Sequence, residues 1–234
     1  MTLSAIGFDA DDTLWHNEYL YTRAKARFVA LLEECSDGAT CARRLDEIET
    51  ANVRCYGYGI KSFILSMIEA ALELSDGRLA AEKVSAILGF ARDMLSADVL
   101  LMDGAGEVLA DLAQCYPLLL ITKGDPAEQK RKIDISGLAG YFRWVEIVHD
   151  KTPAIYQQVL ERCGIPPERF LMVGNALRSD ILPVVQLGGQ AVLIPYDETW
   201  AHEMVETGDI TYATLPNLAA LPAWLQAGEK ELNH

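Results

Sequence analysis

The chain has 234 residues, of which 50% are apolar and 23% are charged, as expected for a globular protein with one large core or a core and a smaller second domain. Its formal net charge of −14, from 34 acidic and 20 basic residues, disfavours a nucleic-acid polymer or an anionic membrane as partner, because those surfaces reward clustered Lys and Arg. No apolar run approaches about 18 residues, and no basic segment precedes Asp9, so we expect neither a membrane span nor a signal peptide, and a cytoplasmic location.

Apolar side chains at residues 5–8 are followed at once by two carboxylates, Asp9 and Asp11. The apolar run predicts a buried strand, and in an open parallel α/β sheet ligands bind beyond the carboxyl ends of the strands. The two acids are therefore expected to face a crevice. Taken alone, such a pair is more often a turn or a helix cap than a catalytic pair, and Asp12 beside it is expected to shape or cap the loop.

Residues from about 19 to 95 contain apolar side chains at helical spacing and no convincing strand pattern. Turn-forming sequences at residues 36–38, 56–59 and 75–77 divide this stretch into successive helices. We therefore expect an all-helical insert between the first strand and the rest of the chain.

From Met102 onward, short apolar runs alternate with amphipathic stretches, a pattern that predicts a parallel sheet with right-handed crossovers. The predicted fold class is α/β, with a doubly wound parallel sheet built by residues 1–15 and 97–234 and an α-helical cap inserted as residues 16–96. The expected strands cover residues 118–121, 144–148, 170–173 and 191–194, and the expected crossover helices lie near residues 105–114, 126–135, 153–163 and 179–187.

Polar side chains follow each of the first four expected strands of this core. Because the carboxyl ends of parallel strands meet at one edge of a sheet, these side chains describe a phosphate and metal site. Carboxylate and hydroxyl oxygens suit a hard divalent cation such as Mg²⁺, which keeps several waters. The candidates are Asp9 and Asp11 after the first strand, Thr122 and Lys123 after the second, Lys151 beyond the third, and Asn175 and Asp180 after the fourth.

These residues resemble the four motifs of the haloacid dehalogenase-like hydrolase superfamily, and the helical insert after the first motif resembles its subfamily with an α-helical cap. Any one of these motifs is a weak signal, but four in the same order are a strong one. The resemblance implies a Rossmann-like core and an enzyme. The matching stretches are residues 8–14, 118–122, 151–153 and 173–181.

The resemblance implies that Asp9 is a nucleophile that attacks phosphorus and forms an aspartyl-phosphate. A carboxylate suits this role because it is already ionised at pH 7 and needs no base. Asp11 would protonate the leaving alcohol and then deprotonate the attacking water. The first of these tasks requires neighbouring carboxylates or burial to raise the pKa of Asp11.

The same resemblance implies that Mg²⁺ is held by Asp9, Asp180 and the backbone carbonyl of Asp11, with Asn175 acting through a bound water. Thr122 would hydrogen-bond a phosphoryl oxygen, and Lys151 would neutralise the phosphate and orient Asp9. The backbone amides around Asp11 and Lys123 would complete the phosphate cradle.

The chain departs from the family pattern at two positions. Asn175 stands where many relatives have Asp, which lowers the charge of the site by one. The third motif reads Lys151-Thr152-Pro153, whereas a proline directly after the lysine is usual, so the reach of Lys151 is an open question. Asp180 has a second interpretation as a helix cap, a position that Asp favours.

The leading functional prediction is a Mg²⁺-dependent phosphatase that acts on a small phosphorylated metabolite. Asp11 and Asp180 argue against haloacid dehalogenation, which needs neither a metal nor a proton donor two residues after the nucleophile. The alternatives are a non-catalytic phosphometabolite-binding protein, a phosphomutase, and a phosphonatase with a lysine in the cap. A homodimer is expected if the insert exposes an apolar face.

Overall fold

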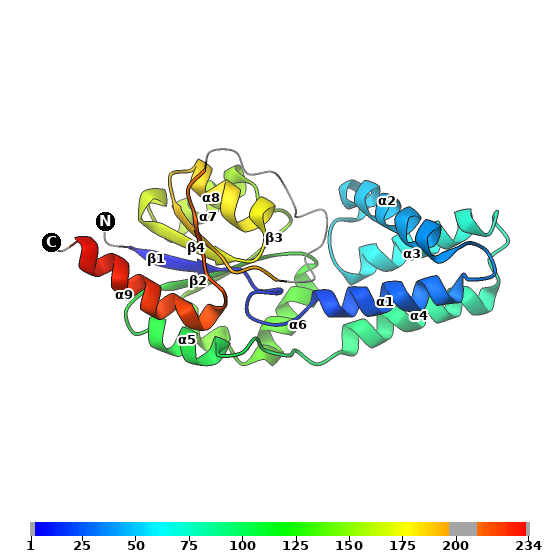
Figure 1. The fold of residues 1–234 in the computed structure, drawn as a ribbon, viewed down its shortest axis with the longest axis horizontal. Coiled ribbons are helices and arrows are strands. Elements are labelled where there is room, and N and C mark those ends of the chain that lie inside the picture. Colours follow the sequence, from blue (N-terminus) through cyan, green and yellow to red (C-terminus); the bar gives the residue numbers. More distant parts are fainter. Residues whose placement is uncertain (1–2, 197–209, 233–234) are drawn as a thin grey trace. The chain divides into compact units, whose positions relative to one another are not determined.

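The computed structural model of the protein describes residues 3–196 and 210–232. The chain forms two compact units, which are treated separately below (Figure 1). The first, here called the α/β unit, comprises Met1–Glu18 and Val99–His234, and the second, here called the helical unit, comprises Tyr19–Asp98. Among the described residues, no helix is both long and apolar enough to cross a bilayer.

The α/β unit contains a six-stranded sheet with the order β3-β2-β1-β4-β5-β6. All neighbouring strands are parallel, and Phe8 of β1 lies opposite Leu120 of β2 and Val173 of β4. The sheet therefore reverses its strand order between β1 and β4, where doubly wound folds place their ligand crevice. This confirms the predicted fold class. The strands are β1 (Ala5–Phe8), β2 (Leu118–Lys123), β3 (Trp144–Val148), β4 (Phe170–Gly174), β5 (Gln190–Leu193) and β6 (Ala213–Thr214).

Helices cover both faces of this sheet (Figure 1). Alternate residues of β2 point to opposite faces, so that Leu120 packs in one core cluster with α5 and α9, and Ile121 in another with α7 and α8. The helices are α5 (Ala105–Leu112), α6 (Pro126–Ser136), α7 (Pro153–Cys163), α8 (Leu182–Gln186) and α9 (Leu221–Leu232), with short helical turns at Ala139–Tyr141, Pro167–Arg169, Leu177–Ile181 and Leu218–Ala220.

The helical unit contains α2, α3, α4 and almost all of α1, and no strand lies within residues 19–98, all of which the structure describes. Its core is apolar and includes Phe28, Phe63 and Met67. Ion pairs join neighbouring helices at the surface, as between Arg27 and Asp93. Several leucines, including Leu65 and Leu72 of α3, are exposed, but homodimer formation stays a prediction. The helices are α1 (Glu18–Leu31), α2 (Gly38–Tyr56), α3 (Ile60–Leu74) and α4 (Ala81–Ser96).

Candidate active site

A buried charge centre lies at the carboxyl edge of the sheet, where β1 and β4 lie side by side. The ammonium of Lys151 donates to Asp9 Oδ1, and it donates to Asp180 Oδ1 at 2.7 Å. The three residues are only 3%, 7% and 1% exposed, respectively. Charged groups are almost never buried to this extent unless they are paired, so the fold keeps this trio at a cost in desolvation.

One ammonium cannot neutralise two carboxylates. Burial, opposed by Lys151 and reinforced by Asp180, raises the pKa of Asp9 from 3.8 to about 7. Burial also disfavours the charged lysine, but the carboxylates of Asp180 and Asp9 hold the pKa of Lys151 well above its usual value. With both acids ionised, the centre carries one negative charge in excess.

Lys151 reaches this centre although threonine, not proline, follows it. Thr152 caps the start of α7, where its hydroxyl accepts a hydrogen bond from the amide of Ile155 at 3.3 Å, and Pro153 occupies the first turn. Proline is favoured at this position because its missing N–H would have no partner within the helix. The extra residue therefore belongs to the helix start, and the question about the reach of Lys151 is answered.

Asp180 lies in a single turn of π-helix, Leu177–Ile181, that follows β4. Its Oδ2 accepts from the amide of Ala176 at 3.0 Å, which precedes Asp180 in the chain, while Oδ1 faces Lys151. Among the described residues, no side chain caps this turn or the start of α8, so the second interpretation of Asp180, as a helix cap, is wrong. A Cβ on Gly174 would lie 2.3 Å from Asp180 Oδ2, which means that only glycine leaves room for this carboxylate. Tyr156 adds support by donating to the carbonyl of Ser179 at 3.1 Å.

The hydroxyl of Thr13 links Asp9 to Asn175. It lies 3.2 Å from Asp9 Oδ2 and 3.4 Å from the amide oxygen of Asn175, and with one proton it can donate to one of them at a time. Asp9, Lys151, Asp180 and Asn175 are thus brought together, as the strand-end pattern predicted.

Thr122 and Lys123 belong to a neighbouring part of the same edge. Thr122 is buried at the end of β2, and its hydroxyl donates to Gln129 Oε1 at 3.3 Å. The ammonium of Lys123 donates to the hydroxyl of Ser179 at 2.7 Å, which connects the end of β2 to the turn that carries Asp180.

Asp11 differs most from expectation. Lys132 Nζ donates to both carboxylate oxygens at 2.7 Å, Gln129 Nε2 to Oδ2 at 2.9 Å, and Trp15 Nε1 to Oδ1 at 2.6 Å. Burial favours the neutral acid, but Lys132 and these hydrogen bonds lower the pKa of Asp11 below its usual value. The expectation that acidic neighbours raise this pKa is therefore wrong for the structure as described, because a lysine from α6 faces the carboxylate.

Asp12 shapes the loop, as predicted. Its carboxylate accepts from the amides of Asn17 and Glu18, at 2.8 Å and 3.1 Å for Oδ1, where α1 begins. Its φ of 61° lies in the left-handed region, which non-glycine residues rarely adopt and Asp tolerates better than most. Burial, only partly offset by these amides, raises the pKa of Asp12 to about 7.

Sequence reasoning missed Gln129 and Lys132, which lie on α6 three residues apart. Residues at this spacing share one face of a helix, and Ile133 beside them is buried. Because Ile133 is apolar, it predicts which face of α6 lies inward, and Gln129 and Lys132 lie on that same face. Their spacing was therefore the available signal that both side chains are directed into the protein. Both are themselves buried, because Asp11, Thr122 and Asn17 supply their partners.

The chemistry of the donors fits a small, hard cation at the charge centre. Within residues 3–196 and 210–232, no group of three or more Asp, Glu, His or Cys side chains is arranged as a metal site. Asp9 and Asp180 still share the ammonium of Lys151, with one negative charge in excess when both are ionised, and the amide oxygen of Asn175 is linked to Asp9 through Thr13. Two carboxylates and an amide oxygen suit Mg²⁺, which keeps several waters.

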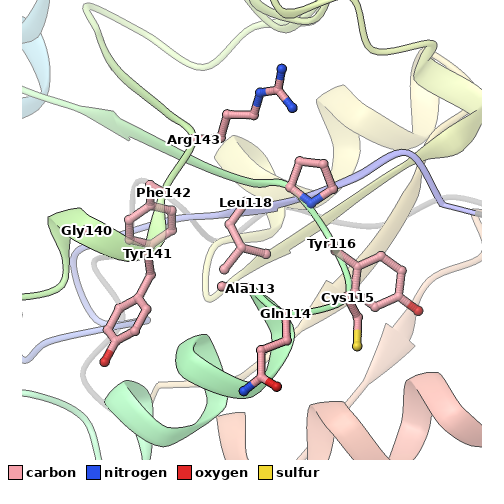
Figure 2. A pocket seen from close by; sticks show the side chains of 10 residues that line it. Ala113, Gln114, Cys115, Tyr116, Leu118, Gly140, Tyr141, Phe142 and Arg143 are labelled. Carbon is pink, nitrogen blue, oxygen red and sulfur yellow. The ribbon is translucent and has the colours of Figure 1, made fainter.

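A pocket of about 500 Å³ lies at the opposite edge of the sheet (Figure 2). Its lining residues include Leu118, at the start of β2, and Arg143, just before β3. In Figure 2 the Arg143 side chain extends away from Tyr116 and Tyr141, and both tyrosine hydroxyls point outward. None of the predicted site residues lines this pocket, so it is separate from the charge centre.

The family follows from the match of the chain to known sequences. A family model described as haloacid dehalogenase-like hydrolase matches residues 3–188. The chain is a haloacid dehalogenase-like hydrolase. This confirms the resemblance drawn from the four motifs, and it makes the protein an enzyme of the hydrolase class.

Relatives of this haloacid dehalogenase-like hydrolase include phosphatases. The 5-amino-6-(5-phospho-D-ribitylamino)uracil phosphatase of Escherichia coli is 24% identical over 207 residues, which are 82% of this chain and 83% of that protein. The glyceraldehyde 3-phosphate phosphatase of Methanothermobacter thermautotrophicus is 30% identical over 122 residues, 49% of this chain and 54% of the relative. The second match thus spans about half of each protein.

Solved structures agree on the fold of this hydrolase. A haloacid dehalogenase-like family hydrolase from Xanthomonas campestris has 36% sequence identity and a TM-score of 0.85, and the match covers 97% of this chain and 96% of that one. An L-2-haloacid dehalogenase from Xanthobacter autotrophicus has a TM-score of 0.67 at 16% identity, with 96% and 99% covered. At so low an identity the second likeness concerns the fold alone.

Proposed function

We propose that this hydrolase is a Mg²⁺-dependent phosphatase that cleaves a small phosphate monoester through an aspartyl-phosphate on Asp9. The observation that carries the proposal is the buried trio of Asp9, Lys151 and Asp180 at the carboxyl edge between β1 and β4. Phosphatases among the relatives add support. The substrate class is a small phosphorylated metabolite.

In the first step, a carboxylate oxygen of Asp9 forms a bond to phosphorus while the bond from phosphorus to the alcohol oxygen breaks. Lys151 holds the Asp9 carboxylate in place and offsets the charge of the phosphate. Thr122 contributes a hydroxyl for a phosphoryl oxygen. Asp11 supplies the proton that the leaving alcohol takes up.

In the second step, water attacks phosphorus, Asp9 is restored and phosphate leaves. Asp11 takes the proton of the attacking water, and its pairing with Lys132 favours the ionised form that this task needs. The first step needs the protonated form of the same carboxyl, and the negative charge of a phosphate substrate favours that form.

Asp9, Asp180 and the backbone carbonyl of Asp11 would hold Mg²⁺, with Asn175 acting through a water. When bound, the ion would offset the repulsion between carboxylate and phosphate, which is about 4 kcal/mol per pair of unit charges at roughly 4 Å and an effective dielectric constant of about 20. The helical unit would serve as the family's cap domain, with residues 1–15 and 97–234 as the catalytic core.

The test is phosphate release from a panel of phosphorylated metabolites, with Mg²⁺ or with EDTA. We expect metal-dependent release from one class of compound and a loss of more than about 1,000-fold in Asp9→Asn, because the nucleophile is removed. Asp111→Asn, which changes an exposed acid on α5, is the matched control and should be as active as the native protein. Binding of a substrate analogue without turnover would instead favour a phosphometabolite-binding protein.

A further inference from the structure

The side chain of Gln129 on α6 joins the two parts of the candidate site. Its Nε2 donates to Asp11 Oδ2 at 2.9 Å and to the carbonyl oxygen of Lys123 at 3.2 Å. Its Oε1 accepts from the hydroxyl of Thr122 at 3.3 Å. One buried amide therefore connects the end of β2 to the loop that follows β1.

The backbone between β2 and α6 leaves room for this amide. Gly124 has a φ of 141°, and a Cβ at that position would lie 2.9 Å from Gln129 Nε2. Asp125 then caps α6 by accepting from the amides of Ala127 and Glu128, at 3.1 Å and 3.0 Å. Gly124 and the capped start of α6 together place Gln129 in the first turns of the helix, where its side chain contacts Thr122.

Asp11 is held from several sides. Besides Gln129, Lys132 donates to both of its oxygens at 2.7 Å, and Trp15 donates to Oδ1 at 2.6 Å. Each carboxylate oxygen thus has at least two donors, and two of the three donor side chains come from α6. This number of contacts fixes the direction of the carboxylate, not merely its position along the chain.

We propose that Gln129 is a positioning residue that orients the Asp11 carboxyl toward the leaving oxygen of the substrate phosphate. The inference rests on the proposed function, in which Asp11 serves the leaving oxygen. Gln129 acts only through Asp11. Its loss should matter most where the leaving group needs a well-placed proton donor, because small misplacements of catalytic groups have large effects on rate.

The experiment compares Gln129→Met with the native protein on two substrates in the presence of Mg²⁺. One is p-nitrophenyl phosphate, whose leaving group departs without a proton, and the other is the alkyl phosphate that the native protein cleaves fastest. The readout is the ratio of the two kcat/KM values, which covers the steps up to departure of the leaving group. Because both values come from one preparation, the fraction of folded protein cancels. Gln157→Met on α7, where a half-buried glutamine donates to Glu161 Oε1 at 2.6 Å, is the matched control.

We expect Gln129→Met to lower the alkyl-to-aryl ratio by about 10-fold, a part of the 100-fold or more that general acid catalysis contributes, and Gln157→Met to leave it unchanged. An unchanged ratio in Gln129→Met, with an active native protein, would overturn the inference and leave the proposed function standing. A native protein that releases phosphate from neither substrate would overturn both.

Discussion

The helical unit and the α/β unit bury different kinds of side chain. In the helical unit the core is formed by apolar residues, with Ser62 and Ser66 as buried polar exceptions, and its ion pairs are largely at the surface. In the α/β unit, Asp9, Lys151 and Asp180 lie almost out of contact with solvent. Buried charges add little to stability compared with well-packed apolar side chains, and the proposed function gives the reason for this difference between the two units.

The comparison can be tested unit by unit, because all four tryptophans lie outside residues 19–98. Tryptophan fluorescence therefore follows the unfolding of the α/β unit. Far-UV circular dichroism follows the helices of both units. Unfolding of the helical unit is therefore measured as the change in circular dichroism that is not accompanied by a change in tryptophan fluorescence. The first three predictions below use this separation, and the fourth uses the circular dichroism signal.

The largest effect is expected from Lys151→Met. This change leaves Asp9 and Asp180 facing each other in a buried site without a cation, which should lower the free energy of unfolding of the α/β unit by about 3–5 kcal/mol and abolish phosphate release. Urea titrations followed by tryptophan fluorescence measure the first effect.

Lys130→Met is the matched control for this lysine, since Lys130 forms an exposed pair with Asp134 at 2.9 Å on α6. We expect a loss of less than about 0.5 kcal/mol, as is usual for exposed helical pairs. Equal losses in the two variants would contradict the claim that the buried charge centre differs from the surface pairs.

In the helical unit, the largest effect should come from removing apolar volume. Met67 of α3 is fully buried, and Met67→Ala should lower the free energy of unfolding of this unit by about 2–5 kcal/mol, as is usual for such cavities. Leu72→Ala, at an exposed position of the same helix, should cost less than about 1 kcal/mol. Similar losses in both variants would show that the apolar core does not determine the stability of this unit.

A smaller effect is expected from Gly174→Ala in the α/β unit. The new methyl group would lie 2.3 Å from Asp180 Oδ2, so Asp180 must move, at a cost of about 1–3 kcal/mol and with reduced phosphate release. Gly106→Ala is the control, because a Cβ on this residue of α5 meets nothing within 4 Å. That change should raise the stability by about 0.5–1 kcal/mol. A Gly174→Ala variant with native stability and activity would contradict the described packing around Asp180.

The smallest effect concerns Glu49, a largely buried acid of the helical unit. Burial raises the pKa of Glu49, opposed by Lys25, whose ammonium lies 3.4 Å from Oε2. This is an ion pair and not a well-formed hydrogen bond, since Oε2 has no hydrogen-bond partner among the described residues. A carboxyl with a raised pKa destabilises the fold when it is ionised, and this cost disappears as the pH falls through the folded pKa toward the unfolded one.

Glu49→Gln should therefore be more stable than the native protein by about 1 kcal/mol at pH 7.5, and the difference should shrink toward pH 4.5, the usual pKa of glutamate. Lys25 keeps a partner in the variant, because Asp46 accepts from it at 2.9 Å. Thermal unfolding at both pH values, followed by circular dichroism, measures the difference. A gap that grows as the pH falls would contradict the direction of the shift.

Much of the fold and of the candidate site could be predicted from the sequence, because the signals that indicate them are local. The strands alternate with helices, and polar residues directly follow the strands, so the positions of Asp9, Thr122 and Lys151 follow from the topology of a parallel sheet. The short strand β6 has two residues, too few for a periodic pattern, and it was missed together with α9.

The partners of Asp11 could not be predicted in the same way. Lys132 lies 121 residues away in the sequence, so the helical spacing that places Gln129 and Lys132 on the inward face of α6 does not show that Asp11 is their partner. The sequence therefore predicted an acid surrounded by acids. The structure instead places an ammonium and an amide against it.

The central claim is that Asp9 becomes phosphorylated. The most direct measurement uses the Asp11→Asn variant, which lacks the base for hydrolysis of the intermediate, incubated with p-nitrophenyl phosphate and Mg²⁺ and quenched in acid. Mass spectrometry of the peptide that contains residues 5–15 should then detect a phosphoryl group on Asp9, and none in a protein that also carries Asp9→Asn. Release of p-nitrophenol with Asp9 unmodified, or with the phosphoryl group on another residue, would contradict the account.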